Sequence, residues 1–241
     1  MVEGYYASAF WGVRKEPVEQ CTQQTVGFLS CLVQCDPCLA HWFKTGRSRK
    51  EALKYEVKLD TATIHALLLA GRSRKDIGRS IIEELGFLIG LWNGAYSDEE
   101  SAGLTIRCGN YTPRTGINYC ELRLPYGEEV RSHLLQVPVL TAVMECMVSA
   151  WKPDWAAVMS RDYEKMLPFP AAHAPRMGWL VYLSSRRGTV PSLPTSVQVV
   201  PLREGSLIIL TEERFTASNP VHVQRARQVE AILNQAGLLG P

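Results

Sequence analysis

The sequence lacks a charge excess of either sign, a long hydrophobic run and a leader-like N-terminus. Its 26 basic and 24 acidic residues give a formal net charge of +2, which excludes a basic field, or acidic mimicry of nucleic acid, over the whole molecule. No run approaches eighteen apolar residues, so we expect no membrane-spanning helix. The opening segment MVEGYYASAFWGVRKE has no basic region followed by an apolar one, as a secretion signal requires. We therefore expect a soluble, cytoplasmic protein.

Familiar active-site motifs are also missing. The sequence has no phosphate-binding G-x-x-x-x-G-K-[ST], no G-x-G-x-x-G after a strand, and no G-x-S-x-G turn. None of its five histidines stands in a familiar catalytic setting. We predict no catalytic residue, no cofactor and no enzymatic activity.

The cysteines form the sharpest local pattern. There are seven of them, and an odd number in a chain of this length favours reduced thiols in a cytoplasm. Cys31, Cys35 and Cys38, followed by His41, have a spacing that can hold an iron–sulfur cluster or zinc, which leaves a metal-dependent enzyme as an alternative. Cys31, however, continues the apolar stripe of a helix. We favour small buried side chains at a helix turn, and no metal site.

A basic segment occurs twice. Gly46-Arg47-Ser48-Arg49-Lys50 recurs as Gly71-Arg72-Ser73-Arg74-Lys75, and three cations in each copy could grip phosphates. A nucleic-acid-binding module is therefore a second alternative. No aromatic residues are interleaved with these cations and the whole chain is not basic, so charge at helix starts is the favoured interpretation. We expect no direct binding of nucleic acid.

The hydrophobic pattern predicts an α+β fold. Apolar residues at helical spacing predict five helices. Four of these begin after Pro17, Asp36-Pro37, Pro138 and Asn219-Pro220, and another contains Ile64, Leu67 and Leu68. The second of these helices would carry Leu39, Trp42 and Phe43, and residues 160–177 would form a loop. Strands are predicted at residues 5–11, 87–92, 104–108, 119–124, 155–159, 179–183, 197–202 and 207–210. We expect one domain, residues 1–241, with a mostly antiparallel or mixed sheet packed against helices.

Several segments, taken together and in order, resemble the immunity protein 52 family of polymorphic toxin systems. They are Tyr5-Tyr6, Phe10-Trp11-Gly12-x-Arg14-x-Glu16, Cys35-Asp36-Pro37, Trp42, residues 46–53, Leu91-Trp92-Asn93-Gly94, Trp151-x-Pro153-Asp154-Trp155, residues 178–184, residues 187–191 and residues 214–220. Lys152 departs from the acidic residue expected before Pro153, which puts any role of that side chain in doubt.

The resemblance implies a bacterial antitoxin, encoded beside its toxin, that acts by binding. Members of this family are associated with restriction-endonuclease-like nuclease toxins, some of them delivered by type VI secretion. The implied partner is thus a cognate nuclease toxin, bound by a monomer or a homodimer. The resemblance implies no catalysis and no cofactor.

Aromatic and charged residues are the first candidates for contact with such a partner, because tryptophan, tyrosine and arginine anchor tight interfaces. Core packing is the alternative for each tryptophan. The exposed acidic loop at residues 97–101 could meet a basic surface. The candidate partner-binding residues are Trp11, Arg14, Glu16, Trp92, Asn93, Asp98, Glu99, Glu100, Trp151, Asp154 and Trp155.

Overall fold

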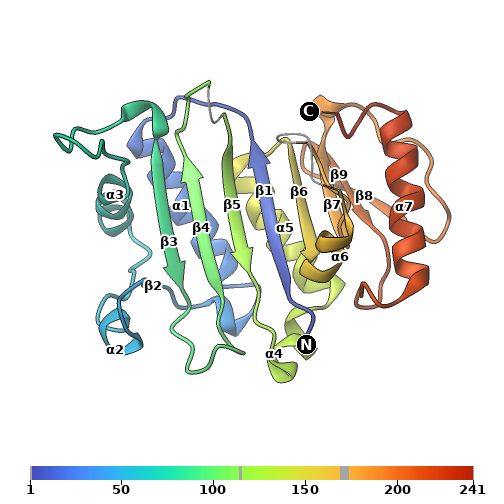
Figure 1. The fold of residues 1–241 in the computed structure, drawn as a ribbon, viewed down its shortest axis with the longest axis horizontal. Coiled ribbons are helices and arrows are strands. Elements are labelled where there is room, and N and C mark those ends of the chain that lie inside the picture. Colours follow the sequence, from blue (N-terminus) through green and yellow to red (C-terminus); the bar gives the residue numbers. More distant parts are fainter. Residues whose placement is uncertain (1, 114–115, 169–173, 241) are drawn as a thin grey trace.

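The computed structural model describes residues 2–113, 116–168 and 174–240. Those residues form one nine-stranded sheet in the order β2-β3-β4-β5-β1-β6-β7-β9-β8, with every neighbouring pair antiparallel (Figure 1). The strands are β1 Tyr5–Trp11, β2 Phe43–Lys44, β3 Phe87–Trp92, β4 Gly103–Cys108, β5 Asn118–Arg123, β6 Trp155–Ser160, β7 Leu180–Ser184, β8 Gln198–Leu202 and β9 Gly205–Ile209. The predicted α+β class is confirmed.

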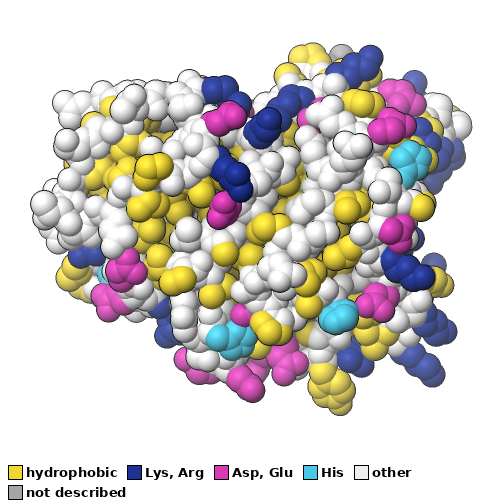
Figure 2. All heavy atoms as spheres, turned by 180° about the vertical axis from the view of Figure 1, so that it is seen from behind, with side chains coloured by type: hydrophobic (Ala, Val, Ile, Leu, Met, Phe, Trp, Pro, Cys, Tyr) yellow, Lys and Arg dark blue, Asp and Glu magenta, His cyan; other side chains and the backbone are white. Residues whose placement is uncertain are grey.

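Helices cover the two faces of this sheet unequally. They are α1 Val18–Leu32, α2 Arg49–Ala52, α3 Thr61–Ala70, α4 Glu128–Leu134, α5 Val137–Trp151, α6 Arg161–Met166 and α7 Pro220–Gln235. In Figure 1, α1 and α5 lie behind the central strands, whereas α7 stands at the far end beside β8 and β9. Figure 2 shows the helix-covered face from behind, with charged side chains mainly along its margins.

Helix α5 shows how the sequence sets these elements. Pro138 stands in its first turn, where a missing N–H costs nothing. Leu140, Val143 and Met147 recur at helical spacing and are fully buried against the sheet. The helix ends at Trp151. Its C-cap, Lys152, adopts a left-handed conformation with φ 44°, and Pro153 cannot continue the helix.

Three predicted elements are wrong. The first basic segment does begin a helix, α2 capped by Ser48, but no helix begins at Ser73 in the second, where Arg72 and Arg74 form isolated bridges. Instead of a second helix through Phe43, the structure has a short 3-10 turn, Pro37–Leu39, and Phe43 pairs with Trp92 at the edge of the sheet. The segment 160–177, predicted as loop, contains α6, because the Ser160 hydroxyl accepts a hydrogen bond from the Tyr163 N–H and caps the helix. Part of that predicted loop, residues 169–173, lies outside the described residues.

The cysteine prediction is wrong for two residues. Cys31 of α1 and Cys146 of α5 form a disulfide, with Cα atoms 5.6 Å apart, because the two helices lie side by side. The Sγ of Cys35 lies 3.6 Å from that of Cys146. An iron–sulfur or zinc site on Cys31, Cys35 and Cys38 would require all three as free thiols, and the disulfide occupies Cys31. Within the described part of the chain, no group of three or more His, Cys, Asp or Glu side chains is placed to hold a metal ion.

Among the described helices, none is by itself long and apolar enough to cross a membrane. The pair α4 and α5 meets the length and composition requirement jointly, but it is bent by 73°.

Candidate partner-binding surface

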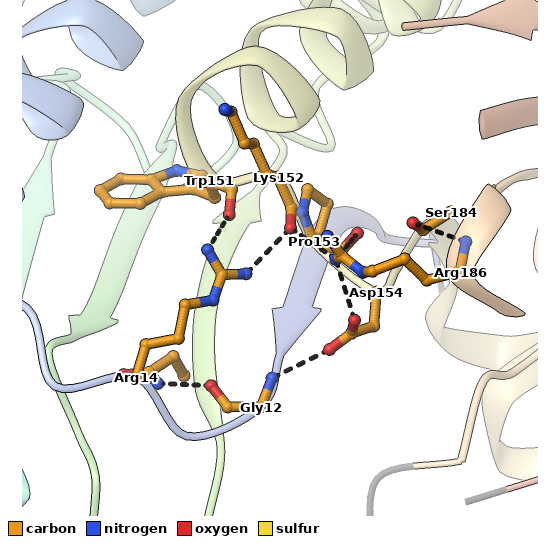
Figure 3. A network of polar contacts seen from close by, with 9 residues as sticks. Gly12, Arg14, Trp151, Lys152, Pro153, Asp154, Ser184 and Arg186 are labelled. Carbon is orange, nitrogen blue, oxygen red and sulfur yellow. Dashed lines mark hydrogen bonds and ion pairs between the residues drawn. The ribbon is translucent and has the colours of Figure 1, made fainter. Parts of the chain in front are cut away.

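Arg14 and the Trp151-x-Pro153-Asp154 motif form a polar network at one end of the sheet (Figure 3). The Arg14 guanidinium donates to the backbone oxygens of Trp151 (3.1 Å) and Lys152 (2.9 Å) at the end of α5. A cation suits this position because the carbonyls that end a helix lack partners. Burial lowers the pKa of Arg14, although Glu16 and Asp154 act in the opposite direction. Arg14 therefore joins the end of β1 to the end of α5.

Asp154 completes the same network. One carboxylate oxygen accepts a hydrogen bond from the Gly12 N–H at 3.0 Å, and the other pairs with Arg186 at 3.0 Å. Arg186 also donates to the carbonyls of Lys152 and Pro153. The predicted partner-binding residues Arg14 and Asp154 thus make contacts within the chain.

Four other predicted residues are buried, and one of them is Trp155 of β6, which is 5% exposed. Trp11 and Trp151 are almost fully inaccessible, and their indoles stack 5.1 Å apart. Glu16 is 8% exposed, and its Oε1 accepts hydrogen bonds from the amides of Gln20 and Gln24. For these residues core packing, rather than contact with a partner, is what the structure shows.

The remaining predicted residues lie near the β3–β4 hairpin. The Asn93 side chain accepts from the Ala102 N–H and donates to the Glu100 carbonyl, so it fixes the turn. Asp98, Glu99 and Glu100 are exposed on that turn. Trp92 is half-buried at the end of β3, and its indole N–H donates to the Ser101 hydroxyl at 3.0 Å.

Trp92 and Trp155 lie on the sheet face opposite α1 and α5, which we call the open face. Its β3, β4 and β5 part is accessible, whereas on β1 and β6 most of its side chains, Trp155 among them, are buried. Side chains alternate along each strand, so every second residue of β3, β4, β5, β1 and β6 lies on it. The strand register arranges them in three rows. In that strand order, the upper row is Leu88, Arg107, Tyr119, Phe10 and Trp155; the middle row is Gly90, Thr105, Glu121, Ser8 and Ala157; and the lower row is Trp92, Gly103, Arg123, Tyr6 and Met159.

The upper row is a ladder of aromatic rings. Phe10 stacks on Trp155 with centroids 4.3 Å apart, and Tyr119 follows 6.4 Å from Phe10. The Arg107 guanidinium continues the ladder 5.9 Å from the centre of the Tyr119 ring. Rigid rings and an arginine are the residues that dominate the energy of protein interfaces.

The open face carries more positive than negative charge. Arg161, at the start of α6, lies over the Tyr6 ring at 4.8 Å and pairs with Glu121 at 3.7 Å. Arg107 and Arg123 have no carboxylate within 4.0 Å among the described residues. With the Arg176–Glu164 ion pair, which lines a cavity on the same face, four arginines thus stand against two glutamates, and the complementary surface is acidic.

The comparison with family models decides what this chain is related to. The model described as immunity protein 52 matches residues 3–241. The chain belongs to the immunity protein 52 family. Membership implies that it binds a cognate toxin protein.

Two further comparisons bear on this member of the immunity protein 52 family. A solved structure described as "Pseudomonas aeruginosa T6SS protein PA0821" is similar with a TM-score of 0.58 and 10% sequence identity, covering 96% of this chain and 72% of that one. At this identity the likeness shows the fold alone. No curated protein matches the sequence significantly.

The open face of this immunity protein 52 member also contains residues that motif reasoning missed. Tyr6, Phe10, Arg107, Tyr119 and Arg123 lie on it, but none was selected as a partner-binding residue. The signal was the alternation within each predicted strand, which separates one face from the other. Which face α1 and α5 would cover depends on tertiary packing, and one strand does not reveal it.

Proposed function

We propose that this chain is the antitoxin of a nuclease toxin delivered by a type VI secretion system, and that it neutralises the toxin by stoichiometric binding. Membership in the immunity protein 52 family supports the binding role. The family's association with restriction-endonuclease-like toxins supports a DNase as the partner. The likeness to a protein whose description names the type VI system supports that route of delivery.

We place the encounter in the cytoplasm, because the DNA that such a toxin cleaves is there. We place it on the open face, because that face combines aromatic rings and two arginines without carboxylate partners among the described residues. This surface is the observation that carries the proposal. Of the charged groups first considered, Arg14, Glu16 and Asp154 are engaged within the chain, whereas Asp98, Glu99 and Glu100 are exposed.

Co-expression with the toxin encoded beside this gene tests the proposal. Cells that produce both proteins should survive induction of the toxin, and the two should co-purify at a fixed ratio. If the wild-type protein leaves killing unchanged and does not co-purify with the toxin, the proposal fails.

A further inference from the structure

We propose that the open face binds an acidic segment of the toxin that crosses β3, β4 and β5 along the middle row. This inference rests on the proposed function and deepens it by assigning the chemistry of the bound segment. Three features carry it: a floor of small side chains on β3 and β4, two flanking arginines without carboxylate partners among the described residues, and a partly apolar cavity beside β1 and β6.

The floor is formed by Gly90 and Thr105, which are adjacent in the register of β3 and β4. A Cβ atom added at Gly90 would meet no heavy atom within 4 Å, so the space above this part of the floor is empty. The upper and lower rows stand four residues apart along each strand, or about 14 Å. That width accommodates one peptide chain with side chains directed toward both rows.

An arginine stands on each side of this floor. Arg107 belongs to the upper row on β4, and Arg123 to the lower row on β5. Arg107 rests on the Tyr119 ring. The Arg123 guanidinium would lie 3.3 Å from a Cβ at Gly103, so a glycine there leaves room for it to lie flat along the lower row. Its Nη2 also lies 3.4 Å from the Ser101 hydroxyl.

These contacts pre-position two guanidinium groups without neutralising them. Arginine binds carboxylates through paired hydrogen bonds, and such charge-assisted bonds are stronger than neutral ones. Side chains that are already ordered lose less conformational freedom when a partner binds. An extended segment that directs one carboxylate toward each row would pair with both Arg107 and Arg123.

The middle row changes character at β5. Glu121 stands there, paired with Arg161, and repels a third carboxylate. Glu121 also lines a cavity of about 250 Å³, whose apolar part is formed by Tyr6, Phe10, Trp155 and Met159 and whose rim carries the Arg176–Glu164 ion pair. An apolar side chain suits this lining. The expected segment therefore has carboxylates over β3–β5 and an apolar anchor next to β1 and β6.

Charge reversal tests the assignment. Affinity for a catalytically inactive form of the cognate toxin is measured by calorimetry for the wild type, Arg107→Glu and Arg123→Glu. Each reversal should weaken binding by about tenfold or more, and raising the salt concentration should weaken wild-type binding. Arg227→Glu is the matched control, because Arg227 is exposed on α7 at the other end of the sheet. Its affinity should change less than about twofold.

A second variant tests the floor without changing charge. Gly90→Trp places a bulky ring in the empty space, at a strand position that tolerates aromatic residues, and should abolish binding while the unfolding midpoint stays near that of the wild type. Val199→Trp on the exposed part of β8 is the control and should bind normally. The variant's unfolding curve separates a blocked surface from a misfolded one.

The outcomes are distinct. If the wild type binds and protects while both reversals and Gly90→Trp bind equally well, the acidic-segment proposal is wrong and the antitoxin function stands. If the wild type neither binds nor protects, both proposals fall. Aromatic rings and arginines on a sheet also suit single-stranded nucleic acid. A salt-dependent mobility shift of a random oligonucleotide that both reversals abolish would overturn the acidic-segment proposal.

Discussion

The indole rings of Trp11 and Trp151 lie nearly parallel, with centroids 5.1 Å apart and planes 10° apart. They join the last residue of β1 to the last residue of α5, and Phe28 of α1 packs 6.0 Å from the Trp151 ring. The stack therefore connects the central strand to two helices. Arg14 lies 5.7 Å from the Trp11 ring and donates to the carbonyl of Trp151, so the aromatic and polar contacts support each other.

Removing this stack should destabilise the fold. Trp151→Ala removes a fully buried ring, and such truncations cost about 3–5 kcal/mol. Urea unfolding followed by circular dichroism measures this change. Trp92→Ala is the control, because Trp92 is half-buried on the open face; it should cost less stability and weaken toxin binding more. The reverse pattern, with Trp151→Ala stable but unable to bind, would place the interface at the stack.

The sequence allowed the elements to be predicted better than their roles. The alternation of residues 5–11 correctly predicted β1, and Asn219-Pro220 correctly predicted the start of α7. The same segments could not show that β1 is the central strand with Trp11 facing helices and Phe10 facing away from them. Trp11 and Trp155 therefore looked alike as candidates, although only Trp155 lies on the open face. Their difference arises from the pairing of β1 with β5 and β6, strands distant in sequence.

Arg14 should contribute to stability through its two hydrogen bonds to the end of α5. Arg14→Ala leaves the carbonyls of Trp151 and Lys152 without this donor, and we expect a loss of about 1–3 kcal/mol in the free energy of unfolding. Arg14→Lys keeps the charge but not the paired geometry, so it should restore only part of the loss. Urea midpoints of the three proteins give the comparison. Equal midpoints for wild type and Arg14→Ala would show that the network does not stabilise the fold.

The position of Cys35 predicts that an alternative disulfide, Cys35–Cys146, forms when Cys31 is replaced. Its Sγ lies 3.6 Å from that of Cys146, whereas burial, aided by the charge of Asp36, raises the pKa of Cys35 to about 11, so at neutral pH it exchanges slowly in the wild type. Alkylation followed by peptide mass mapping should find Cys31–Cys146 in the wild type and Cys35–Cys146 in Cys31→Ser. In Cys31→Ser/Cys35→Ser, Cys146 should be alkylated. A free Cys146 in the single variant would contradict the geometry.

Alkaline conditions should destabilise the protein. Burial raises the pKa of Tyr163 to about 12 and that of Cys35 to about 11. Both groups keep their protons more tightly in the folded chain. Their contribution to the free energy of unfolding is therefore complete below the pKa values of the unfolded chain and is lost as pH rises through those of the folded chain. Urea midpoints should thus fall from about pH 9 toward pH 12.

Tyr163→Phe is the matched variant for this pH dependence. The buried Tyr163 hydroxyl has no hydrogen-bond partner among the described residues, so its removal leaves no donor or acceptor unpaired. We expect stability at neutral pH equal to or above that of the wild type, and a shallower decline above pH 10. Identical slopes for the two proteins would show that Tyr163 does not contribute to the alkaline loss.

The acidic loop provides the last prediction, because it separates two ways of recognising the toxin. Asp98, Glu99 and Glu100 are exposed beside the Trp92 end of the open face. If the loop imitated nucleic acid, replacing all three with their amides would weaken binding strongly. An acidic segment on the open face is instead repelled by these carboxylates, so the triple amide variant should bind the toxin equally well or slightly more tightly. Calorimetry compares the affinity of the triple amide variant for the toxin with that of Arg123→Glu. A larger loss of affinity in the triple variant than in Arg123→Glu would show that the toxin contacts the loop and not the arginines.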